Sequence, residues 1–184
     1  NCDWSSDVCS SDLVNTLREV SKQVQLEGWT FNTEREYPMV RDEATNEIAL
    51  PANLLSIDAN VEEHKNDYDL VMRNGKLYDR NASGKEKDPY KWEDDKLYVD
   101  ITWYFDWDTI PDPIQAFIVA RAAAIFSSRT MGDPNQYQML QQKEAFARAM
   151  AMEYECNQGD FSFFGEPQGE NYYNSYKPFH TLQR

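Results

Sequence analysis

Three carboxylates, Asp106, Asp108 and Asp112, have a spacing that could serve catalysis. A pair of Asp or Glu side chains can hydrolyse a glycosidic bond, one acting as the acid and the other as base or nucleophile. The chain is so rich in acidic residues, however, that some carboxylates will be neighbours by chance. All three also stand where turns and helix caps are expected. We therefore interpret them as structural and keep a glycan-degrading hydrolase as an alternative function.

Other catalytic and metal-binding patterns are missing from the sequence. It contains no glycine-rich phosphate loop after a strand, no Gly-x-Ser-x-Gly elbow and no His-Glu-x-x-His. The two histidines, His64 and His180, are far apart, and their neighbours do not suggest a metal site. The sequence therefore predicts a protein that is not an enzyme and uses no cofactor and no metal.

The first residues need separate treatment. Residues 3–13 read DWSSDVCSSDL, which matches an in-frame translation of a common sequencing adapter. We interpret residues 1–13 as an artefact, exclude them from the fold analysis and expect the true start to be missing. Cys2 and Cys9 fall in this leader, so Cys156 alone remains and cannot form a disulfide within the chain.

The charge of the chain limits its partners. It has 32 acidic and 18 basic residues and a net charge of −14. The leader holds three Asp and no Lys or Arg, so 29 acids and a net charge near −11 remain without it. Binding to nucleic-acid phosphates uses clustered Lys and Arg and is disfavoured here. No apolar run approaches the roughly 18 to 20 residues of a membrane span.

The predicted elements begin with a helix and continue into a β-rich region. Val14–Glu27 has apolar residues at three- and four-residue spacing, and Gly28 follows as a cap, so residues 14–28 are predicted to form one bundle helix. Residues 29–108 are predicted as a β-rich insertion, with strands or strand-like loops in WTFNTEREY and NEIALP and a strand at Lys96–Phe105. Asn74-Gly75 predicts a hairpin over Leu70–Arg80.

Residues 109–158 are predicted to form an antiparallel helical hairpin. Asp112-Pro113 and Asp133-Pro134 each pair a capping Asp with a proline, and Gly132 separates the two helices. Apolar side chains are expected inward on the first helix at Ile114, Phe117, Ile118, Ala122 and Ile125, and on the second at Met139, Phe146, Ala149, Met150 and Met152. The predicted fold class is α+β, an antiparallel helical bundle with an inserted antiparallel β-rich region.

Residues 159–184 are predicted to be an extended tail. Solvated tails normally lack aromatic side chains, but this one holds seven, so it is expected to dock on its own domain, a neighbouring subunit or another partner. We hypothesise that its anchors are Tyr172, Tyr173, Tyr176 and Phe179.

The sequences of four segments, and their order along the chain, resemble those of a known family. They are Gly28-Trp-Thr-Phe-Asn32, an acidic loop ending in Ile110-Pro111, Ser128-Arg-Thr-Met-Gly-Asp-Pro134, and Ala151-Met-Glu-Tyr-Glu155 running into Gly159-Asp160. These segments, and the order of a helix, a strand-rich region and a helical pair, resemble tail tubular protein A over roughly Val14 to Gly169. That family is the head-to-tail adaptor of short-tailed, podovirus-type bacteriophages. Family members carry a further N-terminal helical segment, which the adapter sequence replaces here, so the bundle is expected to be incomplete.

The resemblance implies a structural virion protein. It implies a dodecameric ring that joins the portal protein to the nozzle protein (tail tubular protein B) and the tail fibre, with DNA passing through the ring during ejection without specific binding. The protein would be assembled in the host cytoplasm and reside in the phage tail. The helical pair would form the ring wall, the β-rich insertion its outside or lower rim, and the four anchors would contact a neighbouring subunit or the portal. A non-viral helical interaction domain is the second alternative.

Overall fold

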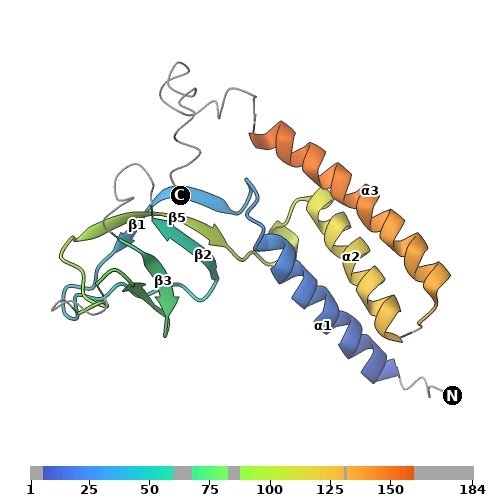
Figure 1. The fold of residues 1–184 in the computed structure, drawn as a ribbon, viewed down its shortest axis with the longest axis horizontal. Coiled ribbons are helices and arrows are strands. Elements are labelled where there is room, and N and C mark those ends of the chain that lie inside the picture. The colour runs from blue at the N-terminus through green and yellow to red at the C-terminus, as the bar shows by residue number, and fades with distance from the viewer. Residues whose placement is uncertain (1–5, 60–67, 83–87, 131, 160–184) are drawn as a thin grey trace. The chain divides into compact units, whose positions relative to one another are not determined.

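The computed structural model describes residues 6–59, 68–82, 88–130 and 132–159, which form an α+β protein (Figure 1). The chain divides into two compact units. Unit 1 spans Asn1–Pro111 and contains α1, the five strands and a short 3-10 helix, and unit 2 spans Asp112–Arg184 and contains α2 and α3. The predicted fold class is confirmed. Whether α1 completes a bundle with the helical hairpin stays a prediction.

Helix α1 runs from Ser6 to Gln25. It begins eight residues before the predicted start at Val14 and therefore includes most of residues 1–13, which the sequence analysis interprets as an artefact. Val20 and Val24 are buried, as their spacing predicted, whereas Val14 is 44% exposed. The chain turns after Gln25, and Gly28 takes a φ of +76°, the left-handed conformation that glycine adopts most readily at a helix end.

The main sheet of unit 1 has three antiparallel strands with the central strand contributed last. Strand β5 (Lys96–Trp103) lies between β1 (Thr33–Val40) and β2 (Leu54–Ala59) (Figure 1). Along β5 the side chains of Leu97, Val99, Ile101 and Trp103 are buried and alternate with more exposed ones, as predicted. A bulge between Glu34 and Tyr37 bends the edge strand β1.

A second, two-stranded sheet forms the predicted hairpin. Strands β3 (Leu70–Arg73) and β4 (Lys76–Asp79) pair antiparallel around Asn74 and Gly75, whose φ angles are +53° and +70°. Positive φ at both central residues is what a type I′ turn requires. The segment NEIALP forms a strand-like loop with an isolated bridge between Ala49 and Lys76, and strand β2 was not predicted.

Gly75→Ala is expected to destabilise the protein by about 1 kcal/mol, because an L side chain disfavours the left-handed conformation. A Cβ at this position would meet no heavy atom within 4 Å, so the cost comes from the backbone alone. Urea unfolding followed by tryptophan fluorescence measures it. Asn74→Gly is the matched control and should change the free energy of unfolding far less. Equal losses in the two variants would contradict the turn assignment.

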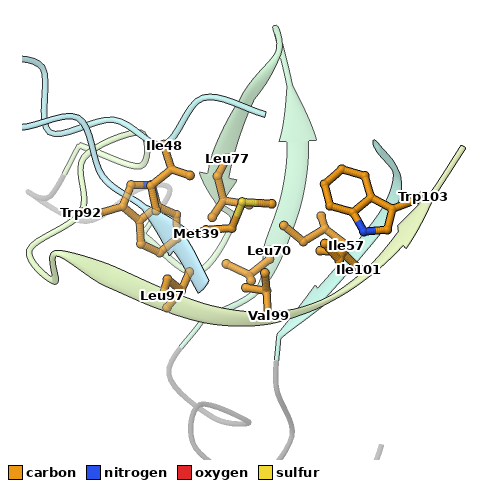
Figure 2. Close-up of a cluster of buried hydrophobic side chains, with 10 residues drawn as sticks. All are labelled: Met39, Ile48, Ile57, Leu70, Leu77, Trp92, Leu97, Val99, Ile101 and Trp103. Atoms are coloured by element: carbon orange, nitrogen blue, oxygen red, sulfur yellow. The ribbon is translucent and has the colours of Figure 1, made fainter. Parts of the chain in front are cut away.

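The core of unit 1 lies between β5 and the β3–β4 hairpin (Figure 2). Its buried side chains come from both sheets and from two connecting loops: Met39, Ile48, Ile57, Leu70, Leu77, Trp92, Leu97, Val99, Ile101 and Trp103. Each large apolar side chain removed from water contributes about 1.5–3 kcal/mol. Trp92 is only 5% exposed, and it anchors the polar segment before β5 in the core.

Unit 2 is an antiparallel pair of long helices, as predicted. Helix α2 spans Asp112–Thr130 and α3 spans Pro134–Gly159, and the two lie side by side (Figure 1). Arg121 of α2 faces Glu144 of α3 with an N–O distance of 3.9 Å. Gly132 between the helices has a φ of +64°. Asp133 caps α3, since its Oδ1 accepts a 2.9 Å hydrogen bond from the backbone N–H of Asn135.

The two helices differ in how well the sequence predicted their inward side. On α2, Ile114, Phe117, Ile118 and Ala122 are buried as expected. On α3 the expected inward set is wrong: the exposed residues include Met139, Phe146, Ala149, Met150 and Met152. Ala151 is the buried residue of α3 within the described part of the chain. Glu144 and Arg148 of α3 contact Arg121 and Phe117 of α2, so the two helices pack through a different stripe from the one expected.

Candidate functional site

The Gly28–Asn32 segment joins α1 to the end of β5 through one buried amide. The side chain of Asn32 is fully buried, and its Nδ2 donates to the backbone oxygens of Gln25 and Trp103 at 2.9 and 2.8 Å. Its Oδ1 accepts the backbone N–H of Trp29 at 2.8 Å. The side chain thus uses both donors and one acceptor, which is the condition for burying a polar group without a large cost.

A second buried amide, Gln25, connects the same two elements. Its Oε1 accepts the backbone N–H of Phe105 at 2.8 Å, and its Nε2 donates to the Phe105 oxygen at 3.0 Å. This two-way pairing imitates a rung of a β-ladder, so the last turn of α1 is bonded to the chain just after β5. The Nε2 also donates to Ser21 Oγ at 3.1 Å.

Trp29 completes the junction. Its Nε1 donates to the oxygen of Val24 at 2.7 Å and so satisfies one of the carbonyls left open at the end of α1. Gln25, Trp29 and Asn32 make up the helix–sheet junction, and none of the three carries a charge. The junction can hold α1 rigidly on the sheet, but it offers no acid, base or nucleophile. The GWTFN motif was recognised from the sequence, but the role of Gln25 was missed. No pattern in the neighbouring residues indicates its bonds to Phe105.

The three carboxylates weighed as catalytic residues are all exposed. Asp106 precedes the 3-10 helix η1 (Trp107–Thr109) and accepts the backbone N–H of Thr109 with its backbone oxygen at 3.0 Å. Asp108 lies in η1 and Asp112 is the first residue of α2, in the other unit. Their placement fits the interpretation as turn and helix-end residues.

One pocket of about 370 Å³ lies in unit 1 and does not include these carboxylates. It is lined by Arg41, Asn46, Asp88, Lys91, Trp92 and Glu93. Arg41 is already engaged there, since it pairs with Asp95 at 2.5 Å and donates to Asn46 Oδ1 at 2.9 Å and to the Trp92 oxygen at 3.2 Å. These bonds tie two loops together beside the buried Trp92.

Other candidate residues are distributed without forming a site. His64, His180 and the four hypothesised anchors Tyr172, Tyr173, Tyr176 and Phe179 lie outside the described residues. Cys156 is free and exposed. Within the described ranges, no group of three or more His, Cys, Asp or Glu side chains is placed to hold a metal ion. In the same ranges, no helix combines the length and the apolar character needed to cross a membrane.

Helix α3 presents an apolar surface that nothing in the described chain covers. Met139, Phe146 and Met150 are 63%, 71% and 48% exposed. Their separations of seven and four residues place them along one side of the helix, and we call them the outer stripe. Large exposed apolar groups that line up in this way mark interaction surfaces more often than isolated ones do.

An uncharged junction and a long helix with an exposed apolar stripe are typical of a protein that assembles with others. Comparison with models of protein families gives a match to the tail tubular proteins over residues 6–161. The chain therefore belongs to the tail tubular protein family and is a structural component of a bacteriophage tail. The match begins at residue 6, inside residues 1–13. That residues 1–13 are an artefact stays a prediction. Comparison with curated proteins gives no match to this chain.

Proposed function

We propose that the protein is the subunit of an adaptor ring that joins the portal to the tail nozzle and fibre, and that DNA passes through this ring during ejection. The observation that carries the proposal is α3. This helix of 26 residues has a single buried residue in the described chain, although helices are normally stabilised by burying an apolar face. Such a helix needs a partner, and a ring of identical subunits supplies one.

A closed ring fits the arrangement of unit 2. In a head-to-tail ring each subunit offers two unlike surfaces that repeat around the circle. The α2–α3 hairpin is long and narrow, and so it is suited to stand as a wall between two neighbours. The β-rich unit 1 would then lie on the outside or lower rim. Assembly with other tail proteins follows from the family, and twelve copies are what the resemblance implies.

The charge distribution is compatible with the passage of DNA. Residues 1–111 hold 24 acidic and 12 basic residues, and residues 112–184 hold 8 and 6. The acidity therefore belongs mainly to unit 1, while unit 2 is close to neutral. Whichever unit lines the channel, neither has an excess of Lys and Arg that would hold phosphates and slow the moving duplex.

The two alternatives are less well supported. A glycan hydrolase needs paired carboxylates in a shielded site, and Asp106, Asp108 and Asp112 are exposed. The family match runs through the β-rich region as well as the helices, which argues against a non-viral domain that shares only a helical hairpin.

Light scattering of the full chain, alone and mixed with the portal ring of the same phage, tests the proposal. We expect a complex on the portal whose added mass equals roughly twelve chains of 21.5 kDa, as the family implies. Alanine at Tyr172, Tyr173, Tyr176 and Phe179 should weaken or abolish this complex. A folded monomer that ignores the portal would refute the adaptor function. Release of reducing sugar from host polysaccharide would then test the hydrolase.

A further inference from the structure

The outer stripe of α3 is accompanied by a candidate occupant in the same sequence. Residues 160–184 follow α3 directly and contain aromatic side chains at Tyr173, Tyr176 and Phe179, every third residue. Pro178 in this stretch disfavours a helix. In an extended chain, residues three apart are separated by about 10 Å. Met139 and Phe146, seven residues apart on a helix, are separated by about the same distance, roughly 10.5 Å.

We propose that the outer stripe of one subunit binds the aromatic anchors of a neighbouring subunit. The inference rests on the proposed ring and names the two surfaces that meet in it. The stripe and the anchors are unlike surfaces on one chain, which is what a head-to-tail contact requires of each copy. The spacing match lets Tyr176 lie against Phe146 while Phe179 lies against Met139, without a change in register.

The length of the tail supports a contact between copies. Tyr172 and Phe179 come 13 and 20 residues after Gly159, so an extended chain carries them about 43 to 66 Å from the end of α3. The helix itself is only about 39 Å long. The anchors can therefore pass beyond their own helix and reach the next one. Binding to their own stripe would require the chain to reverse and leave most of this length in a loop.

The chemistry of the stripe suits aromatic rings. Two of its three side chains are methionines, which adapt to irregular surfaces and make favourable sulfur–aromatic contacts. Lys143 lies one turn from both Met139 and Phe146, where its ammonium group can rest on a tyrosine ring. Aromatic anchors of this kind dominate the energetics of most protein interfaces.

Disulfide trapping between two singly labelled proteins tests the contact. Cys2, Cys9 and Cys156 are first replaced by Ser. One protein then carries Phe146→Cys and the other Tyr176→Cys, and the mixture is oxidised mildly at high concentration, both free and after loading on the portal. We expect a cross-linked heterodimer. The matched control pairs Tyr176→Cys with Met152→Cys, which is 45% exposed on α3 but lies on a different side of the helix, and should give several-fold less.

Each result decides the matter. A heterodimer yield no higher than the control, in both the free and the loaded samples, overturns the inference. So does an intramolecular disulfide in a single chain carrying both cysteines at low concentration, since that would place the anchors on their own stripe. Loading of the unmodified protein on the portal, measured by light scattering, reports separately on the adaptor function. A ring that assembles without this cross-link would refute the contact and leave the adaptor intact.

Discussion

Asn32→Asp is expected to lower the free energy of unfolding by about 3–5 kcal/mol at pH 7, because it places an unpaired charge in a buried site. The substitution hardly changes the shape of the side chain. It replaces the Nδ2 donor, which serves the backbone oxygens of Gln25 and Trp103, by a carboxylate oxygen that faces both of them. The two hydrogen bonds that Asn32 donates become two repulsive contacts between oxygen atoms. Helix α1 then loses part of its attachment to β5.

The pH dependence of this variant gives a second measurement. Burial and the two facing carbonyls raise the pKa of the introduced carboxyl above its unfolded value of about 3.9. The folded state therefore binds the proton more tightly than the unfolded state does. It follows that the variant is least impaired below about pH 4, where the carboxyl is protonated and can donate, and loses stability as the pH rises.

Urea unfolding of the variant and the wild type at pH 4 and pH 7 makes the comparison. Asn15→Asp, on the exposed side of α1, is the matched control and is expected to change stability by less than about 0.5 kcal/mol at either pH. A loss in Asn32→Asp that is no larger than in the control, or that does not depend on pH, would show that this amide is not the joint between helix and sheet.

Phe117→Ala is expected to destabilise the helical hairpin by about 3–5 kcal/mol, through lost burial and the cavity that remains. The ring of Phe117 is fully buried, and the guanidinium carbon of Arg148 on α3 lies 5.5 Å from its centroid. The substitution thus removes both an apolar anchor of α2 and a cation–π contact between the helices. Thermal unfolding followed by far-ultraviolet circular dichroism measures the loss.

Phe146→Ala provides the same chemical change at an exposed position. Phe146 is 71% exposed, so its truncation should cost less than about 0.5 kcal/mol in the free protein. The same variant should weaken assembly, because Phe146 lies in the outer stripe. Equal destabilisation by the two truncations would mean that Phe146 is packed inside the subunit, and the outer stripe would then not be available to a partner.

Much of the local structure followed from the sequence because its signals are local. Asn74-Gly75 determines the hairpin through the positive φ of both residues. The alternation in β5 decides which side chains face the core, since successive residues of a strand point to opposite sides. Asp133-Pro134 and Gly132 mark the start of α3 and the end of the preceding turn. The sequences of GWTFN and three later segments predicted the family, and the family match confirmed it.

The tertiary structure alone decided how these pieces are joined. Gln25 bonds to Phe105, 80 residues away, and no pattern near either residue announces that pairing. The outward position of Met139 and Phe146 was also beyond the sequence, because helix periodicity gives the residues that share a side but not which side meets a partner within the chain. The helical spacing predicts the apolar side chains of α3 to be part of the core. The structure leaves them exposed because Glu144 and Arg148 lie on the side of α3 that contacts α2.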